Sequence, residues 1–223
     1  MSKVASKTGR IEGVVLDVYG TLVEIGDKRH TYKQMLTLLA SRGRTPLRSD
    51  ARTVMTIDGG LHAALQALQA TIEPGEIEQL QRSLQLELDS VRLAESARGT
   101  LARLRDAGVP VVLCSNLASP YASPPREMLS DLLPLGDQSF VWSFEVKAVK
   151  PERAMYAAAC AALNLPPGRV LMVGDSLDAD VLGPRRFGLQ ALHLDRLAPN
   201  DSVDPGALRS LASLPQWLGL RPV

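Results

Sequence analysis

Three carboxylates follow one short apolar segment in the last third of the chain. The apolar segment 169–173 leads into Asp175, and Asp178 and Asp180 come directly afterwards. Carboxylate oxygens are the ligands that Mg²⁺ prefers in proteins, so this spacing indicates a site for a hard cation. The same residues would also suit the start of a capped helix, because acidic side chains are favoured in its first turn.

A further carboxylate ends the first apolar segment of the chain. The run 14–16 leads directly into Asp17, and Gly20 and Thr21 follow three and four residues later. A carboxylate that leaves a buried strand into a glycine-containing loop is held rigidly and still meets a ligand. Such a group can attack as a nucleophile and form a covalent intermediate. An aspartate that only stabilises a turn is the structural alternative.

Two more segments end in polar residues. Ser115 and Asn116 follow the apolar run 109–114, and they offer a hydroxyl and an amide that can hold an oxyanion. They could equally cap a loop. Lys150 precedes Pro151, which suits the first position of a helix, and a lysine there could simply be solvated. Each pattern alone is weak, but together and in this order they indicate an active site.

Strand-like and helix-like patterns alternate along most of the chain. Short apolar runs that are typical of strands buried on both faces lie at 14–16, 109–114, 139–146, 169–173 and 189–194. Helical spacing of apolar residues occupies 100–107, 151–163 and 178–187. This alternation predicts an α/β fold with a doubly wound parallel sheet. Ligands bind at the carboxyl ends of the strands in such sheets, where the polar residues above are expected to stand.

The first connection between strands is far too long for a simple crossover. Between about residues 23 and 97 we find no convincing strand, but three helical patterns at 29–42, 57–70 and 75–92. A crossover needs about a dozen residues, so this segment is interpreted as an inserted helical subdomain. The predicted core therefore comprises 11–22 and 98–223, and the inserted subdomain 23–97. The proline-rich segment 119–125 is expected to be a loop.

Composition excludes several classes of protein. The 223 residues carry 25 Lys and Arg against 24 Asp and Glu, so a nucleic-acid partner is not expected. No apolar run reaches the roughly 18–20 residues of a membrane span, and the N-terminus has no apolar signal region. The two cysteines, Cys114 and Cys160, form neither a disulfide framework nor a metal motif. We expect a cytoplasmic monomer or homodimer that acts on a small molecule and binds no membrane.

Taken together, these segments resemble the haloacid dehalogenase-like (HAD) hydrolase superfamily. Its four motifs occur in order as LDVYGT (16–21), CSN (114–116), VKP (149–151) and VGDSLDAD (173–180). The resemblance extends from residue 12 to about residue 195. It implies a Rossmann-like core, and it identifies the insertion at 23–97 as a helical cap.

The resemblance also implies roles for single residues. The catalytic set is Asp17, Thr21, Ser115, Asn116, Lys150 and Asp180. The substrate-binding set is Tyr19, Ser115 and Asn116, and Mg²⁺ would be held by Asp17, Asp175 and the backbone carbonyl of Tyr19. Asp17 would be the nucleophile, and Lys150 would neutralise negative charge on it and on the substrate. Elementary electrostatics agrees, because two neighbouring carboxylates need a nearby cation to ionise together without a raised pKa.

The first motif departs from the phosphatase pattern at Tyr19. Most phosphatases of the superfamily have a second aspartate at this position, which acts as general acid and base. A phenol with a reference pKa of about 10 suits that task poorly near neutral pH. The D-x-Y-G-T form resembles the 2-haloacid dehalogenases, in which halide leaves without a proton. Asn116 after Ser115 also fits the dehalogenase pattern.

The fourth motif points the other way. Asp175 stands where the dehalogenases carry a neutral residue, and the tryptophan of their S-x-N-x-W-D motif is absent. Their cap supplies aromatic residues and an arginine, whereas here Tyr32 is the cap's one aromatic residue, beside the candidate arginines Arg44, Arg48 and Arg52. We therefore predict a Mg²⁺-dependent hydrolase of a small phosphorylated or related metabolite. The alternatives are a metal-independent 2-haloacid dehalogenase and a HAD-like binding protein without catalysis.

Overall fold

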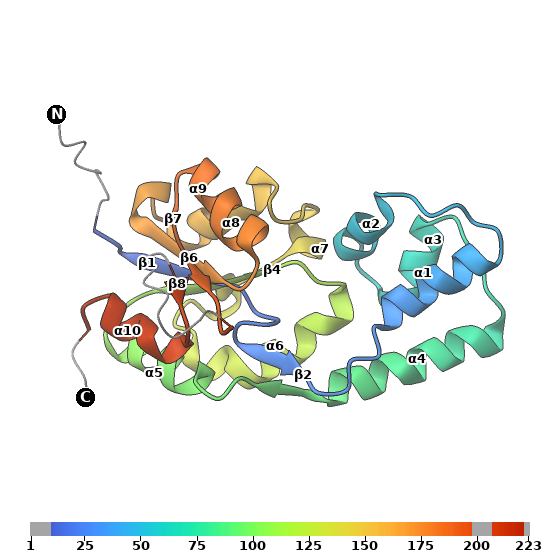
Figure 1. Cartoon of the computed structure of the whole chain (residues 1–223), viewed down its shortest axis with the longest axis horizontal. Helices are drawn as coiled ribbons and strands as arrows, with labels where there is room; N and C mark the ends of the chain where they lie inside the picture. Colours follow the sequence, from blue (N-terminus) through green and yellow to red (C-terminus); the bar gives the residue numbers. More distant parts are fainter. Residues whose placement is uncertain (1–9, 198–206, 221–223) are drawn as a thin grey trace.

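The centre of the molecule is a six-stranded parallel sheet, seen in a computed structural model that describes residues 10–197 and 207–220 (Figure 1). The strand order is β5-β4-β1-β6-β7-β8. Their bounds are β1 (Gly13–Leu16), β4 (Val111–Ser115), β5 (Phe140–Trp142), β6 (Val170–Gly174), β7 (Gln190–Leu194) and β8 (Ala207–Leu208). The predicted parallel α/β sheet is confirmed, and β8 is a sixth strand that the sequence did not indicate.

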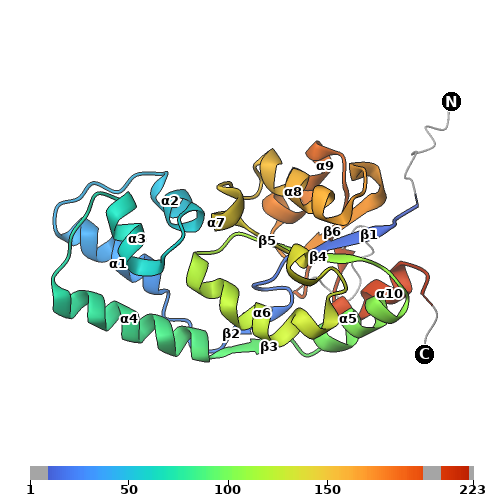
Figure 2. The ribbon, with the colours of Figure 1, turned by 180° about the vertical axis from the view of Figure 1, so that it is seen from behind.

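Both faces of the sheet are buried under helices. In β1, Val14 and Leu16 face one apolar core while Val15 faces the other, as the period of two in a strand requires. Helices α5 (Ala97–Asp106), α6 (Ser123–Leu129) and α10 (Leu214–Trp217) pack on the first face. Helices α8 (Arg153–Leu163) and α9 (Gly183–Phe187) pack on the second (Figures 1 and 2). The sheet is therefore doubly wound.

The order of the strands reverses at β1. The chain runs from β1 outward through β4 to β5, and then crosses to β6 on the other side of β1 before it continues to β7 and β8. β1 is thus flanked by strands from both halves of the core, in register with Val111–Leu113 and with Val170–Val173. Its carboxyl end lies at the topological switch point, where ligands bind in open α/β sheets.

A group of four helices forms a cap at one end of the core (Figure 2). They are α1 (Thr31–Ser41), α2 (Asp50–Thr56), α3 (Gly60–Ala67) and α4 (Pro74–Asp89). Their apolar faces share a separate core that includes Met35, Leu65 and Leu84. The helices predicted at 29–42, 57–70 and 75–92 correspond to α1, α3 and α4. The short helix α2 was not predicted, because seven residues do not establish a helical period.

The expectation that no strand lies between residues 23 and 97 is wrong. β2 (Val23–Ile25) and β3 (Val91–Leu93) pair as an antiparallel ribbon in which Glu24 is opposite Arg92. The ribbon is separate from the main sheet, whose strand order it does not interrupt. Each strand has only three residues, and its partner lies more than sixty residues away in the sequence, so no local pattern predicts the pair.

Three other expectations need correction. The segment predicted as one strand at 139–146 ends as β5 at Trp142 and continues as the short helix α7 (Ser143–Val146). The predicted loop at 119–125 is a 3₁₀ turn followed by α6, because proline is tolerated in the first turn of a helix. The helix predicted at 178–187 is a π-helical turn, Leu177–Leu182, that leads into α9.

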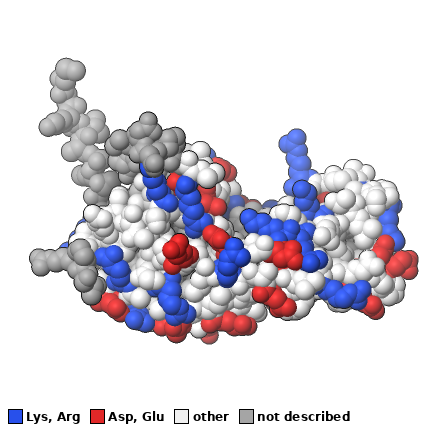
Figure 3. Space-filling model, turned by 60° about the horizontal axis from the view of Figure 1, so that its bottom comes forward, with Lys and Arg blue, Asp and Glu red and all other residues white. Residues whose placement is uncertain are grey.

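The distribution of charged side chains on the surface agrees with the near-neutral charge balance of the sequence. Lys and Arg side chains are interspersed with Asp and Glu side chains on the face that Figure 3 shows. Among the described residues, no helix combines the length and the apolar character that a membrane crossing needs.

Candidate active site

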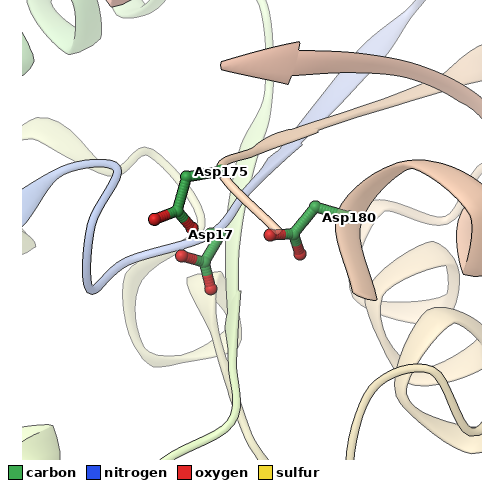
Figure 4. Close-up of side chains that lie close together, drawn as sticks. All are labelled: Asp17, Asp175 and Asp180. Atoms are coloured by element: carbon green, nitrogen blue, oxygen red, sulfur yellow. The ribbon is translucent and has the colours of Figure 1, made fainter. Parts of the chain in front are cut away.

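Three aspartates meet at the carboxyl ends of β1 and β6. Asp17 follows β1, Asp175 follows β6, and Asp180 lies in the π-helical turn after it (Figure 4). One carboxylate oxygen from each lies within 4.8 Å of the other two. Asp17 and Asp180 are buried, whereas Asp175 is exposed. The carboxylates come together because β1 and β6 are neighbours in register, so that residues following their ends face one another.

A buried lysine joins two of these carboxylates. Lys150 Nζ donates hydrogen bonds to Asp17 Oδ1 at 2.7 Å, to Asp180 Oδ1 at 2.7 Å and to the Cys114 carbonyl at 2.8 Å. Burial by itself would lower the pKa of Lys150, but the charges of Asp17 and Asp180 outweigh it and raise the pKa above its usual value. The ammonium therefore stays charged, and all three of its protons have acceptors.

Two hydroxyls complete the surroundings of Asp17. Ser115 donates to Asp17 Oδ1 at 3.2 Å, and Thr21 donates to Oδ2 at 3.3 Å. Each carboxylate oxygen of Asp17 therefore has at least one donor from a neighbouring strand end or loop. The structure brings together four of the predicted catalytic side chains around this carboxylate: Thr21, Ser115, Lys150 and, through the lysine, Asp180.

Asp175 and Asp180 lie in contrasting environments. Asp180 accepts from Lys150 and from the Ser176 N–H at 3.0 Å, and burial raises its pKa to about 6 against the pull of Lys150. Within the described parts of the chain, no other residue's side chain donates to the Asp175 carboxylate. Its carboxylate is nevertheless partly screened from water, and this desolvation together with the charge of Asp17 raises the pKa of Asp175 above its ordinary value. Asp175 is thus the member of the cluster whose oxygens are left for a cation.

Two glycines allow this close approach. Gly20 has a φ of +92°, and a side chain there would collide with the Asp175 carboxylate. Gly174 ends β6, and a Cβ there would collide with the Asp180 carboxylate and lie 2.8 Å from Cβ of Asp17. The loops that carry the three aspartates can pack together only because both positions lack a side chain.

Asn116 contacts the main chain of Lys150 with both ends of its amide. Its Nδ2 donates to the Lys150 carbonyl at 2.8 Å, and its Oδ1 accepts from the Lys150 N–H at 2.6 Å. The amide therefore fixes the backbone from which the lysine reaches Asp17. The Lys150–Pro151 peptide bond is cis, and α8 begins only at Arg153, so Pro151 lies before the helix rather than at its first position. A direct contact between Asn116 and substrate stays a prediction.

The side chain of Tyr19 points into the boundary between core and cap. Its hydroxyl donates to the Tyr121 carbonyl at 2.8 Å, and the two rings meet edge to face at 5.8 Å. Burial and the nearby charge of Glu87 raise the pKa of Tyr19 above its ordinary value. A phenol with a raised pKa is a poor proton donor, so Tyr19 does not replace the missing acid.

Sequence reasoning missed Tyr121 and Glu87, which connect the active site to the cap. Tyr121 donates to Glu87 Oε2 at 2.8 Å, and Glu87 also accepts from the N–H groups of His30 and Thr31 at the start of α1. The one available indication was the scarcity of aromatic residues: the chain has only four tyrosines, and three of them meet here.

The candidate cap arginines do not reach the nucleophile. Arg44 pairs with Asp50 inside the cap, where it holds the pKa of that carboxyl at about 2. Arg52 crosses to the core and pairs with Glu152 at 2.6 Å, two residues after Lys150. Arg48 is exposed. Rather than reaching the nucleophile, Arg52 joins α2 of the cap to the start of α8 through its ion pair with Glu152.

Comparison with known proteins defines the class to which this site belongs. The family model for haloacid dehalogenase-like hydrolases matches residues 11–188. The chain therefore belongs to the haloacid dehalogenase-like hydrolase family, and it is an enzyme of the hydrolase class.

Particular relatives include both phosphatases and dehalogenases. A ribulose-1,5-bisphosphate 5-phosphatase from Halopiger xanaduensis is 29% identical over 119 residues, which are 52% of this chain and 48% of that protein. The chain thus matches about half the length of this curated relative. A HAD phosphatase from Thermococcus onnurineus has a TM-score of 0.63 at 20% identity, over 96% of this chain and 100% of the other. A 2-haloacid dehalogenase from Pseudomonas syringae pv. Tomato has the same TM-score at 19% identity, over 94% and 98%. These structural likenesses establish the fold.

Proposed function

We propose that the protein is a Mg²⁺-dependent hydrolase that transfers a phosphoryl group from a small metabolite to Asp17 and then to water. The observation that carries this proposal is Asp175, a carboxylate without a side-chain donor that lies beside the buried pair of Asp17 and Lys150. Asp175 has no evident purpose in a site that works without a cation. The phosphatase activity in the name of the Halopiger relative supports the same substrate class.

The charges of the site fit a divalent cation. Three carboxylates face one ammonium, which leaves two uncompensated negative charges. Asp17 and Asp175 would hold the ion, with the backbone carbonyl of Tyr19 as a further oxygen ligand, while Asp180 is engaged by Lys150. When bound, Mg²⁺ would compensate these charges and stabilise the negative charge of the transferred phosphoryl group.

The residues of the chain divide the remaining work. An Asp17 oxygen attacks phosphorus, the bond from phosphorus to the leaving oxygen breaks, and the leaving group departs with the electron pair. Water then attacks the phosphorus of the aspartyl phosphate, which releases inorganic phosphate and restores the carboxylate. Lys150 holds Asp17 in place and offsets charge on the phosphoryl oxygens, and Ser115 and Thr21 orient the nucleophile. Asp180 positions Lys150.

A metal-independent 2-haloacid dehalogenase is the second candidate. Tyr19 favours it, because a carboxylate can displace halide without any proton donor at this position. In that reaction Asp17 would attack carbon, halide would leave with the bonding electrons, and water would hydrolyse the resulting ester. The dehalogenase reaction does not use the carboxylate of Asp175, and for this reason the dehalogenase is the second candidate.

A substrate panel separates the two candidates. Phosphate esters and 2-chloroalkanoates are incubated with the purified protein, once with Mg²⁺ and once with EDTA, and phosphate and halide release are measured. We expect phosphate release that needs Mg²⁺. Halide release that persists in EDTA would identify the dehalogenase. Failure of every substrate, together with a melting temperature that does not respond to Mg²⁺, would favour a protein without catalysis.

Binding of Mg²⁺ should be visible without turnover. At a concentration ten times the dissociation constant, ligand linkage stabilises the folded state by about 1.4 kcal/mol, which raises the melting temperature by about 3–6 °C for a chain of this size. The Asp175→Ala variant should lose this rise. Asp178→Ala is the matched control, since Asp178 lies three residues after Asp175 but pairs with Arg186 outside the cluster. A melting temperature unchanged in millimolar Mg²⁺, at constant ionic strength, would contradict the metal site.

A further inference from the structure

An apolar pocket of about 300 Å³ lies between the core and the cap. Its lining includes Tyr19, Leu117 and Tyr121 from the core, and Tyr32 and Met55 from the cap. The volume lies at the lower end of the range for small-molecule sites, which is about 300–1,000 Å³. We infer that this pocket receives the leaving group of the substrate, and that this group is a flat, apolar ring attached directly to the phosphate oxygen. The inference rests on the proposed phosphohydrolase function.

The position of the pocket suits a leaving group. Tyr19 stands two residues after the nucleophile Asp17, and Asn116 follows Ser115, whose hydroxyl bonds to Asp17; both Tyr19 and Asn116 line the pocket. A second and more polar cavity is lined by Gly20 and Asp175, and Tyr19 borders it as well. The two cavities therefore adjoin at Tyr19. A phosphoryl group beside Asp175 would have its ester oxygen directed toward the apolar pocket.

The walls of the pocket favour an aromatic ring over an aliphatic chain. Tyr121 meets Tyr19 edge to face at an interplanar angle of 89°, and it lies 6.2 Å from the ring of Tyr32. Aromatic side chains arranged in this way offer ring edges and faces to a further ring at similar spacing. The chain has few aromatic residues, so the gathering of three tyrosines at one pocket beside the nucleophile is a specific feature of the site.

The tyrosine walls of the pocket offer poor proton donors, although His30 and Lys33 also line it. The hydroxyls of Tyr19 and Tyr121 already donate to protein acceptors, the Tyr121 carbonyl and Glu87 Oε2, each at 2.8 Å. Burial alone would raise the pKa of Glu87, but hydrogen bonds from Tyr121 and from the start of α1 lower it below its usual value, so Glu87 is ionised. A leaving group that lies against these tyrosines gains no proton from them and departs readily only as a stable anion. An aryl oxide meets that condition and an alkoxide does not.

Three phosphate compounds separate recognition of the ring from activation of the leaving group. Phenyl phosphate has both a ring and a good leaving group, benzyl phosphate has the ring only, and acetyl phosphate has the good leaving group only. We expect phenyl and benzyl phosphate to share a low KM, with kcat for benzyl phosphate lower by about 10²–10⁴-fold. Acetyl phosphate should turn over with a KM at least about tenfold higher than that of phenyl phosphate. Equal KM values for phenyl and acetyl phosphate would overturn the inference.

Variants of Met55 test the position of the pocket. Met55 lies on α2 and is partly exposed, so it tolerates a change of size. Met55→Trp should fill the pocket and lower the ratio of kcat/KM for phenyl over acetyl phosphate by about tenfold. Met55→Ala should enlarge it and improve kcat/KM for 1-naphthyl phosphate relative to phenyl phosphate. Leu86→Trp on the exposed side of α4, outside the pocket, is the control and should leave both ratios unchanged. If both Met55 variants leave these ratios unchanged, as the control does, the ring of the substrate binds elsewhere.

The design keeps failure of this inference apart from failure of the proposed function. Acetyl phosphate hydrolysis that needs Asp17 would establish the function whatever happens at the pocket. Binding is measured independently. Inert phenylphosphonate should raise the melting temperature more than methylphosphonate does, and this difference should be smaller in Met55→Trp.

His30 also lines the pocket. Benzyl phosphate turnover as fast as that of phenyl phosphate, lost in His30→Gln, would show that the imidazole supplies the proton and that the restriction to aryl groups is wrong.

Discussion

Replacement of Asp17 by asparagine is expected to reduce kcat for every substrate by on the order of 10⁴-fold or more, as loss of a nucleophile does in other covalent mechanisms. The amide nitrogen cannot attack phosphorus or carbon, and the amide oxygen is too weakly basic to replace the carboxylate. The loss should be the same for phosphate esters and for 2-chloroalkanoates, because both candidate reactions begin at this oxygen. Purified Asp17→Asn protein that retains activity would contradict the covalent mechanism.

The Asp17→Asn variant should nevertheless fold. Lys150 keeps its second carboxylate partner, Asp180, at 2.7 Å and its hydrogen bond to the Cys114 carbonyl, so no buried ammonium is left without a counter-charge. Circular dichroism and the melting temperature of the variant provide the control. Lys150→Met would be the harsher change, because it leaves Asp17 and Asp180 buried and facing each other without a cation.

The position of the site could be predicted because it depends on local patterns and one topological rule. Asp17, Ser115 and Asp175 stand at or just beyond the ends of short apolar strands, and the ends of neighbouring parallel strands meet at one edge of a sheet. Lys150 was predicted through the family resemblance alone. Its contacts depend on Asn116, which holds the Lys150 main chain from the neighbouring strand end.

The contacts between core and cap could not be predicted. Tyr121 and Glu87 are 34 residues apart and lie on different parts of the fold, and neither has a local pattern that indicates a hydrogen bond between them. The same is true of the ribbon of β2 and β3, whose two strands are separated in the sequence by the whole cap. Such features depend on long-range packing, whereas hydrophobic periodicity reports the immediate neighbourhood of a residue.

The combination of Tyr19 with Asp175 makes physical sense if the substrate itself supplies a good leaving group. In the proposed mechanism Asp175 would hold a cation beside the phosphoryl group, and Tyr19 would provide an apolar wall beside the nucleophile in place of a proton donor. An enzyme built in this way loses the ability to cleave alkyl phosphates rapidly, but it gains a binding surface for an aromatic group. The dehalogenase-like first motif and the phosphatase-like fourth motif are then compatible within one mechanism.

Tyr19→Asp is the variant that tests this interpretation most directly. General acid catalysis contributes about 10²–10⁴-fold to such reactions, and benzyl phosphate should lag behind phenyl phosphate by that order in the parent enzyme. An aspartate that reaches the leaving oxygen should recover part of this gap for benzyl phosphate, while the KM of phenyl phosphate rises because one aromatic wall is lost. The ratio of the two kcat values is the quantity to measure.

Tyr19→Asn and Tyr19→Phe are the matched controls. Asparagine has the shape of aspartate without its acidity. A gain in kcat for benzyl phosphate in both Tyr19→Asp and Tyr19→Asn would therefore reflect altered packing rather than proton transfer. Phenylalanine keeps the ring but loses the hydrogen bond to the Tyr121 carbonyl, and it should leave the ratio near its parent value. In a dehalogenase, Tyr19→Asp should instead slow the reaction, because a new carboxylate repels both the departing halide and the carboxylate of the substrate. Two results together would therefore establish the metal-independent reaction. The parent enzyme would release halide from 2-chloropropionate in EDTA faster than Tyr19→Asp does, and neither protein would show phosphatase activity.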